Sequence, residues 1–216
     1  MDEHSDDVNT RADNVRLIGG PLCLDFCNTV DDHRKEYPKE YLKEYADLIA
    51  WGQHAGAISA ATARQLREEA ARHPERGRQV LARALALRQS LWSLFSTVAA
   101  STMPATAHLE AVNAALSGTP TRTRIVPTER GFTWERLEDS DALDQVLWSV
   151  VWSAADLLTG DKLWQVRECG GLNCSWLFLD TSRSRSRRWC SMADCGNRAK
   201  ARRHYARSKR RRTDDR

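Results

Sequence analysis

Hydrophobic residues in the first 160 positions recur mostly at the three- and four-residue spacing of amphipathic helices. Pro21 suits the first helical position of the earliest one, because its ring fixes φ and its missing N–H is not needed there. Ser59 is a suitable N-cap for the third, and Gly160 ends the last and most apolar one. We expect helices over residues 21–30, 42–52, 60–73, 76–100, 105–116 and 141–159.

The periodicity changes outside these helices. Residues 122–127 and 131–137 alternate in polarity around a turn, which predicts a β-hairpin. Residues 15–20 end in a Gly-Gly pair and are expected to form a short strand. The polar residues 1–14 show no pattern of this kind, and we expect them to form a disordered tail.

The chain changes character again after residue 162, where apolar residues become sparse and cysteine and arginine become frequent. Residues 163–167 and 176–179 are expected to be short strands, and residues 180–186 a loop rich in Ser and Arg. A helical stretch is expected to begin at Asn197 and to end at about Arg212.

Four cysteines in this last segment form two pairs with the same internal spacing. Cys169 and Cys174 have four residues between them, as do Cys190 and Cys195, and fifteen residues separate the pairs. Each pair can fold into a tight knuckle, and together they offer the closed tetrahedral set of thiolates that structural zinc prefers. A redox dithiol favours two intervening residues, and catalytic zinc needs an open position. We therefore expect one structural zinc ion per chain.

These patterns predict an α+β fold, with a mainly α-helical N-terminal domain that contains one β-hairpin and a treble-clef-like zinc finger at the C-terminus. The expected divisions are a tail over residues 1–14, the helical domain over 15–162, the four-cysteine finger with its basic helix over 163–212, and a tail over 213–216.

Charge divides the chain in the same place. Residues 163–216 contain 15 Lys and Arg against 5 Asp and Glu, whereas residues 1–162 contain 18 against 24. The acidic body is a poor match for nucleic acid, while the basic finger is a good one. We expect its contacts to come from Arg183, Arg185, Arg187, Arg188, Asn197, Arg198, Arg202, Arg203 and Lys209.

Polar and thiol side chains interrupt the apolar pattern of the first expected helix. Cys23 and Cys27 lie one turn apart among apolar residues and are expected to be buried core thiols. Asp25 and Asn28 have two interpretations. They either make a cap or a buried polar bond to the following loop, or they line a ligand pocket in the body.

The finger sequence closely resembles the CGNR zinc-finger family, and the N-terminal part resembles the ABATE domain that usually precedes this finger. The resemblance is carried by residues 189–192 (Trp-Cys-Ser-Met), 195–198 (Cys-Gly-Asn-Arg), 178–180 (Phe-Leu-Asp), 19–20 (Gly-Gly) and 24–30 (Leu-Asp-Phe-Cys-Asn-Thr-Val), with Cys169 and Cys174. Cys27 replaces the valine or alanine usual in the family. The resemblance implies a stress-induced bacterial transcription regulator.

We therefore expect a zinc-dependent DNA-binding regulator whose body senses a small-molecule effector or forms a homodimer. One alternative is an RNA-binding protein that uses the same finger, with exposed aromatic side chains such as Tyr205 as stacking surfaces. Another is a small-molecule binder or enzyme with its site near Asp25 and Asn28. No catalytic motif is visible, so an enzyme is not the expectation.

The chain has no apolar run of about 18 residues, so no membrane partner is expected. Its N-terminus lacks the basic start and apolar stretch of a signal peptide. We expect a cytoplasmic protein, in which cysteines remain reduced and available to a metal.

Overall fold

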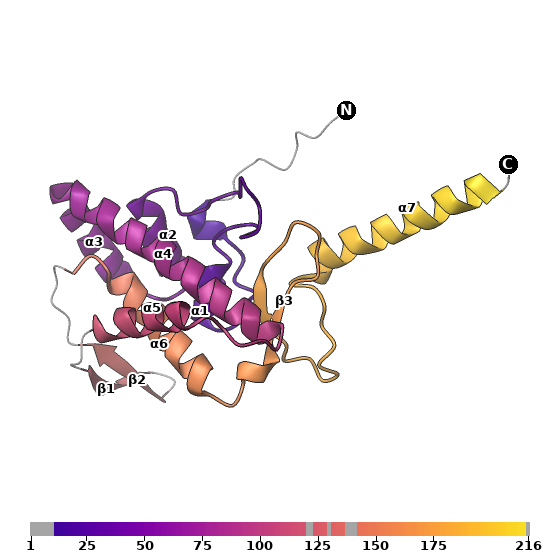
Figure 1. Cartoon of the computed structure of the whole chain (residues 1–216). Coiled ribbons are helices and arrows are strands. Elements are labelled where there is room, and N and C mark those ends of the chain that lie inside the picture. Colours follow the sequence, from indigo (N-terminus) through magenta and orange to yellow (C-terminus); the bar gives the residue numbers. More distant parts are fainter. Residues whose placement is uncertain (1–10, 120–122, 129–130, 137–141, 215–216) are drawn as a thin grey trace.

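The computed structural model describes residues 11–119, 123–128, 131–136 and 142–214, and most of them are helical (Figure 1). The α-helices are α1 (Leu22–Cys27), α2 (Tyr45–His54), α3 (Ala60–Arg72), α4 (Pro74–Ala99), α5 (Thr106–Ser117), α6 (Gln145–Thr159) and α7 (Asn197–Asp214). All the helices predicted from periodicity are present. The mainly helical fold with a β-hairpin and a C-terminal finger is therefore confirmed.

Two of the helix boundaries follow directly from local chemistry. The Ser59 hydroxyl accepts a hydrogen bond from the Thr62 amide at 3.0 Å and caps α3 as predicted. Helix α4 begins at Pro74, two residues before the predicted start, because proline at the first position leaves no helical hydrogen bond unmade.

Helix α1 is shorter than predicted and lies at the centre of the molecule. It ends at Cys27 and does not continue to residue 30, because the Thr29 hydroxyl donates to the Phe26 carbonyl and Asn28 bonds a distant strand. The five residues from Cys23 to Cys27 are buried against α4 and α6. The helix is therefore enclosed on all sides.

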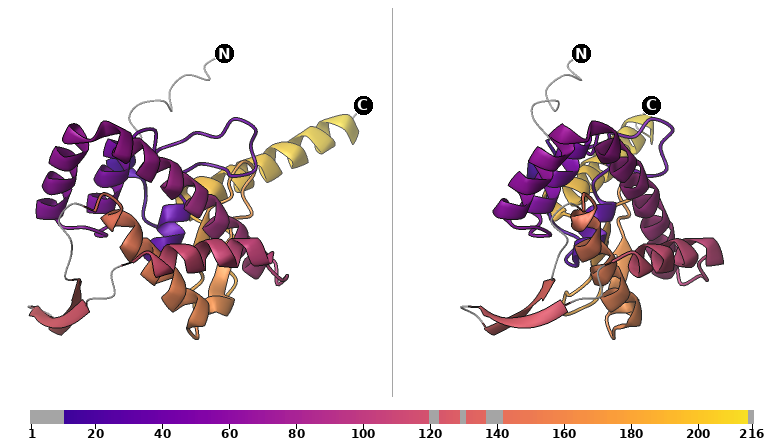
Figure 2. Two further views of the ribbon diagram at one scale, coloured as in Figure 1. Left: turned by 60° about the vertical axis from the view of Figure 1, so that its left-hand side comes forward. Right: turned by 90° about the vertical axis from the view of Figure 1, so that its left-hand side faces the viewer.

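Two antiparallel strand pairs complete the fold. Strands β1 (Thr123–Thr128) and β2 (Gly131–Arg136) form the predicted hairpin, with Pro127 opposite Phe132, at an edge of the body far from α7 (Figure 2). Strands β3 (Val166–Glu168) and β4 (Leu177–Leu179) pair within the finger. The strand expected from residue 163 is in part a 3-10 turn, Leu163–Gln165, that leads into β3.

The segment from residue 12 to residue 20 forms neither the disordered tail nor the short strand that the sequence predicted. Residues Ala12–Asn14, expected to belong to a disordered tail, form a 3-10 turn with Ala12 buried. Residues 15–20 run extended but are not a strand of either sheet. The Gly19 carbonyl accepts a single hydrogen bond from the Leu179 amide at 2.9 Å, so this segment lies against β4 without forming a ladder.

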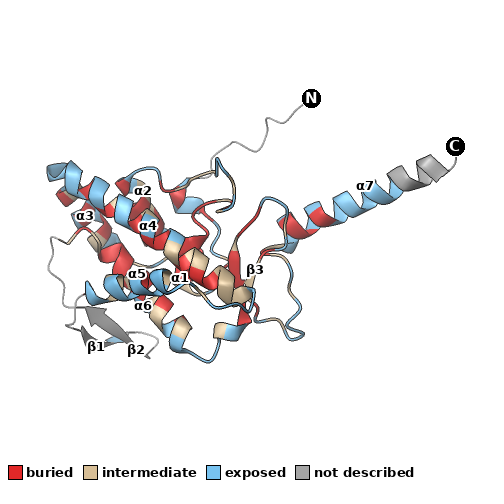
Figure 3. Ribbon diagram, viewed as in Figure 1, coloured by how far each residue is buried: buried red, intermediate tan, exposed pale blue. Residues whose placement is uncertain are grey.

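The finger shares the main hydrophobic core with the body. Val166 of β3 and Leu177 of β4 belong to the large cluster built from α1, α2, α4 and α6. A smaller cluster contains only the four buried cysteines and Phe178, with Ile18 and two tryptophans at its border. Figure 3 shows the contrast with α7, which is buried only at its start and otherwise projects from the molecule. No helix in the described ranges is long and apolar enough to cross a membrane.

Candidate metal centre

Four thiols converge at the C-terminal side of the shared core. Cys169 and Cys174 lie on the turn between β3 and β4. Cys190 follows the Ser/Arg loop of residues 180–186, and Cys195 lies in a π turn, Met192–Gly196, that leads into α7. All four are buried, and their sulfur atoms lie within 4.8 Å of one another. The structure therefore brings together every predicted metal ligand.

The sulfur geometry fits a tetrahedral zinc ion. A tetrahedron with Zn–S distances of about 2.3 Å has edges of about 3.8 Å. The Cys190 Sγ lies 3.7 Å from the Cys174 Sγ and 3.6 Å from the Cys195 Sγ. Four sulfur donors leave no position for a substrate, so zinc bound here would cross-link the two halves of the finger and supply no catalytic chemistry.

Hydrogen bonds from the surrounding chain stabilise thiolate charge at two of the ligands. The Cys169 Sγ accepts from the amides of Gly171 at 3.4 Å and Cys190 at 3.3 Å. The Arg198 guanidinium donates to the Cys195 Sγ at 3.1 Å, and this bond raises the pKa of Arg198. Donors of this kind orient metal ligands and offset the charge of the thiolates.

The thiols compete for protons in the absence of metal. Hydrogen bonds from the Cys174 and Cys190 thiols lower the pKa of Cys169, whereas the bond to Cys169 raises the pKa of each partner. Zinc must displace the remaining protons, so its affinity rises with pH.

Close packing around the sulfur atoms requires glycine at position 171. A Cβ atom there would lie 2.9 Å from the Cys195 Sγ and 3.3 Å from the Cys169 Sγ. Asn173 has a φ of 58°, a left-handed conformation that asparagine tolerates better than most residues. The knuckle sequence is therefore fixed by backbone geometry as well as by metal ligands.

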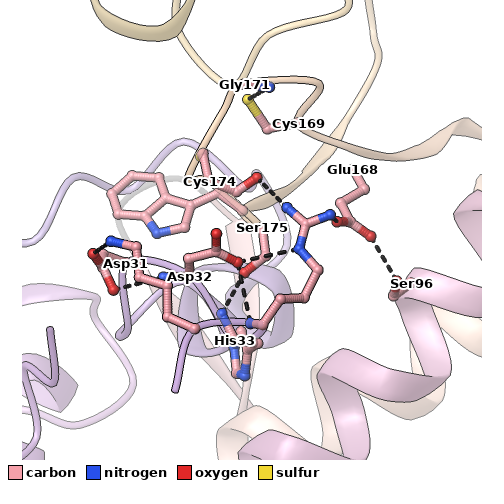
Figure 4. A network of polar contacts seen from close by, with 12 residues as sticks. Asp31, Asp32, His33, Ser96, Glu168, Cys169, Gly171, Cys174 and Ser175 are labelled. Atoms are coloured by element: carbon pink, nitrogen blue, oxygen red, sulfur yellow. Dashed lines mark hydrogen bonds and ion pairs between the residues drawn. The ribbon is translucent and has the colours of Figure 1, made fainter. Parts of the chain in front are cut away.

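The first knuckle is held by a loop of the body that follows α1 (Figure 4). The Arg34 guanidinium donates to the Cys174 carbonyl at 2.8 Å and pairs with Glu168 at 2.9 Å. Glu168 also accepts from the Ser96 hydroxyl of α4 at 2.6 Å, and the Asp32 carboxylate accepts from Arg34 at 3.2 Å. These bonds connect the metal-binding turn to two separate elements of the body.

Asn28 makes the most complete of the contacts between body and finger. Its side-chain amide donates to the Leu177 carbonyl at 2.9 Å and its carbonyl accepts from the Leu177 amide at 2.8 Å, all within the interior. Trp176 donates to the Val30 carbonyl at 2.7 Å, and Trp92 donates to the Ser175 carbonyl at 3.0 Å. The finger is thereby fixed rigidly on the body.

Asp25 also uses its polar atoms internally. Its carboxylate accepts from the Gly19 amide at 2.7 Å, and burial raises its pKa to about 6. Asp25 and Asn28 do not line the cleft beside the metal centre, the cleft at the C-terminal end of α6 or the one between α4 and residues 142–144. The contacts agree with the interpretation as buried polar bonds, except that the partners lie in the segment before α1 and in β4. Burial raises the pKa of Cys23 to about 12, as expected of a core thiol.

The arginines from residue 183 to residue 188 lie in the Ser/Arg loop and directly after it, and they differ in their contacts. Arg187 donates to the Trp189 carbonyl at 3.0 Å and lies 4.2 Å from the centre of the Phe178 ring, so it supports the second knuckle. Arg185 lies over the Trp164 ring at 4.7 Å. Arg183 and Arg188 are exposed.

The residues expected to contact nucleic acid on α7 lie at the surface. Asn197, Arg198, Arg202 and Arg203 are exposed, and so are all other described side chains from residue 200 to 208. The guanidinium of Arg198, expected to contact nucleic acid, donates a hydrogen bond to the Cys195 sulfur. Lys209 belongs to α7, but its side chain lies outside the described residues.

The arrangement defines a zinc-binding protein in which a helical body carries a C-terminal four-cysteine finger. A family model named ABATE and described as "Putative stress-induced transcription regulator" matches residues 20–161, and a CGNR zinc finger model matches residues 165–208. The chain therefore belongs to the ABATE family and carries one structural zinc in a CGNR finger. Curated proteins include no match to it.

The sequence predicted the ligands but not the residues that position them. Arg34, Asn28, Ser96 and Trp92 lie far from the cysteines in sequence, and nothing in their local pattern indicates the contact. The sequence offers one indication of these contacts, the polar run after α1, because buried polar residues next to an apolar helix need hydrogen-bond partners.

Proposed function

We propose that this protein is a zinc-dependent regulator that binds duplex DNA through α7. The observation that carries the proposal is the exposure of this helix, which begins at the metal centre and leaves the body with no packed face from residue 201 to 208 (Figure 3). A helix that is polar on every side needs a partner outside the chain to be ordered over its whole length.

The arrangement of basic residues around α7 suits a DNA groove. Successive residues turn by about 100° around a helix. Lys200, Arg203 and Arg207 therefore share one flank, and Arg198 and Arg202 share the flank almost opposite. The major groove is about 12 Å wide and admits a helix of about this diameter, so the two flanks would face the two phosphate backbones.

The position of the buried residue on α7 supports the same orientation of the helix in the groove. Ala199 is the one buried residue among the described side chains of the helix, so its side of the helix faces the molecule. Asn197, Ala201 and Ser208 lie on the opposite side by helical geometry and carry short side chains. Short side chains between basic flanks would meet the base edges, so we assign base contacts to Asn197 and phosphate contacts to Lys200, Arg202, Arg203 and Arg207.

We propose that the Ser/Arg loop, which leads to the second zinc knuckle, adds phosphate contacts. Asp180 is buried and accepts from the amides of Ser182 and Arg187, both at 3.0 Å, so the loop has a fixed shape. We propose phosphate contacts for Arg183 and Arg188. Arg185 and Arg187 would contribute mainly by shaping the loop.

Paired substitutions with matched charge test the proposal. We expect Arg202→Ala combined with Arg203→Ala to weaken binding of a mixed-sequence duplex by on the order of tenfold to a hundredfold at 0.1 M salt. Arg64→Ala combined with Arg67→Ala removes the same charge from exposed positions of α3 and should leave affinity unchanged. Fluorescence anisotropy of zinc-loaded full-length protein measures both. Equal losses in the two variants would contradict the proposal.

RNA is the second candidate because Tyr205 is 76% exposed among the arginines of α7 and could stack on an unpaired base. The aromatic side chains around the metal centre are less accessible, since Phe178 is fully buried and Trp176 and Trp189 are half-buried. Competition between duplex DNA and single-stranded RNA of the same sequence separates the two candidates.

The proposal extends to the body. We propose that it senses a small-molecule effector or forms a homodimer, and that the protein acts in the cytoplasm, where reduced cysteines retain their metal. The alternative of a ligand or catalytic site at Asp25 and Asn28 gains no support from their internal hydrogen bonds.

A further inference from the structure

A cleft of about 620 Å³ lies along the C-terminal part of α6, at the lower edge of the molecule in Figure 1, where the chain turns from the body into the finger. Part of its lining is a single face of α6, because the residues follow the three- and four-residue spacing of a helix: Ser149, Trp152, Ser153, Asp156, Leu157 and Gly160. The other described lining residues are Gly20, Pro21, Asp161, Lys162 and Leu179. Sites for small molecules commonly have volumes of about 300–1,000 Å³, so the cleft has a suitable size.

Negative charge predominates in the described lining of this cleft. It contains the carboxylates of Asp156 and Asp161 against the single ammonium of Lys162. Both aspartates are exposed, and neither carboxylate forms an ion pair or a hydrogen bond with any residue in the described part of the chain, Lys162 included. Both carboxylates are therefore available to a ligand.

The end of α6 adds to this negative potential. The carbonyl groups of the last helical turn have no partners within a helix, and they give its C-terminus about half a negative charge. The Gly118 amide bonds carbonyls of this kind at the end of α5. The chain after α6 instead becomes extended at Gly160, and no described amide bonds the carbonyls of residues 156–159. The last turn of α6 also contains no basic residue, so this end of the cleft favours a cation.

The rest of the lining suits a cation with an apolar body. The Trp152 side chain is 38% exposed and lines the cleft together with Pro21, Leu157 and Leu179. An organic cation is attracted to the face of a tryptophan ring. Trp152 and Asp156 lie one turn apart on the same face of α6, so the ring and the carboxylate can contact the same ligand. A hydrated metal ion would gain nothing from the apolar part of this surface.

We infer that this cleft binds a small organic amine, whose ammonium group contacts Asp156 and Asp161 and whose apolar body packs on Trp152. Leu179 ends β4, and the next residue, Asp180, fixes the Ser/Arg loop through two backbone amides. The consequence for regulation rests on the proposed function, since a ligand that contacts Leu179 is coupled to the affinity of this loop for DNA. Binding of the amine itself does not depend on DNA.

Benzylamine and its neutral analogue benzyl alcohol test this inference with the zinc-loaded full-length protein. Benzylamine is an ammonium ion at neutral pH, and the alcohol has nearly the same shape without the charge. We expect saturable binding of benzylamine, measured by ligand-observed NMR at constant ionic strength, with a Kd on the order of 1 mM or tighter. Benzyl alcohol should bind at least about tenfold more weakly, because it lacks the charge that the carboxylates recognise.

Substitutions locate the binding site. Asp156→Asn should weaken benzylamine binding about tenfold, and Asp161→Asn should do the same if the first variant fails to fold. Glu68→Gln removes the same charge from an exposed position of α3 that does not line the cleft, and it should have no effect.

Three results would overturn the inference: no saturable binding of benzylamine at about 10 mM, equal binding of benzyl alcohol, or unchanged binding by both cleft variants. If Asp156→Asn changes the sedimentation of the protein while benzylamine does not bind, the cleft is a contact between copies of the chain and the inference is wrong. Benzylamine binding by a protein without affinity for DNA would contradict the proposed function alone. Duplex binding without benzylamine binding would contradict this inference alone.

Discussion

Individual residues in this protein have separable tasks even where they are neighbours. In α1, Cys23 and Cys27 fill the core, Asp25 holds the segment before the helix, and Asn28 holds β4. In the finger, the cysteines carry the metal site while Arg198 and Arg187 support the sulfur atoms and the second knuckle. Substitution at these positions should therefore produce different and specific losses.

The assignment of the zinc ligands is tested by substituting one cysteine of the metal centre and one cysteine of the main core. Cys190→Ala should abolish stoichiometric zinc, because three thiolates leave the tetrahedral shell open. Cys27→Ala should retain one zinc per chain, since Cys27 is buried in the main core away from the metal centre. Elemental analysis of the purified variants measures both. Full zinc content in Cys190→Ala would contradict the ligand assignment.

Asp25 makes the stability of the fold depend on pH. Burial raises its pKa from 3.8 to about 6, so the folded state favours the protonated form. The protonated carboxyl stabilises the fold fully at pH values below the pKa of Asp25 in the unfolded chain. This contribution is lost as pH rises through the pKa of Asp25 in the folded protein, and the free energy of unfolding then falls by up to about 3 kcal/mol.

Asp25→Asn should remove this dependence. The free energy of unfolding of the variant, relative to the native chain, should increase between pH 4 and pH 7 by roughly 1–3 kcal/mol. Urea unfolding of both proteins at the two pH values measures the difference. A constant difference would show that Asp25 is ionised in the fold throughout this range.

At the scale of elements, α7 stands apart from the other helices. Helices α1 to α4 and α6 each bury several residues, and α5 packs Val112, Ala115 and Leu116 against the core, whereas α7 has a single buried residue at its first turn in the described part. It also places like charges four residues apart, at Arg198 and Arg202 and at Arg203 and Arg207, which destabilises an isolated helix. Phosphate groups would neutralise these charges, so binding and helix formation should be coupled.

Amide hydrogen exchange tests this coupling. Amides of residues 201–208 should exchange rapidly in the free zinc-loaded protein and become protected when duplex DNA is bound, because packing supplies most of a helix's stability. Amides of α4, with its buried face, provide the control and should be protected in both states. Strong protection of residues 201–208 without DNA would contradict the account.

At the scale of the whole molecule, the body and the finger share one hydrophobic core. The sequence favours a body that folds without the finger, because its helices bury many apolar residues. The structure places Val166 and Leu177 of the finger in that same core and connects Asn28, Arg34 and Trp176 across the boundary. Removal of the finger would leave the α1 surface and several polar groups without partners.

A chain truncated after Lys162 should therefore be less stable than the sequence alone suggests. We expect a broad thermal transition and binding of a hydrophobic dye, compared with one cooperative transition in the full-length zinc-loaded protein. A chain ending at Ser208 keeps the shared core and should melt like the native protein. A sharp transition of the shorter chain would show that the body is independent.

The contrast between α3 and α1 shows what sequence reasoning could reach. Ser59 and the apolar spacing predicted α3 almost to the residue, and the cysteine spacing predicted the metal ligands, because both signals are local. Asn28 and Arg34 act on residues about 140 positions away, so their tasks depend on tertiary packing. The same limit applies to Arg198. It lies in a run of basic residues, and nothing in that run predicts that its guanidinium donates to the Cys195 sulfur.

The most direct test of the central claim is the salt dependence of duplex binding by the zinc-loaded full-length protein. If Arg183, Arg188, Lys200, Arg202, Arg203 and Arg207 each neutralise a phosphate, log K should fall against log salt concentration with a slope of roughly −5 to −6. The Arg202→Ala, Arg203→Ala variant should give a slope shallower by about two. The account is contradicted if the native protein, with its zinc confirmed, binds no duplex at about 50 mM salt, where charge contacts are strongest.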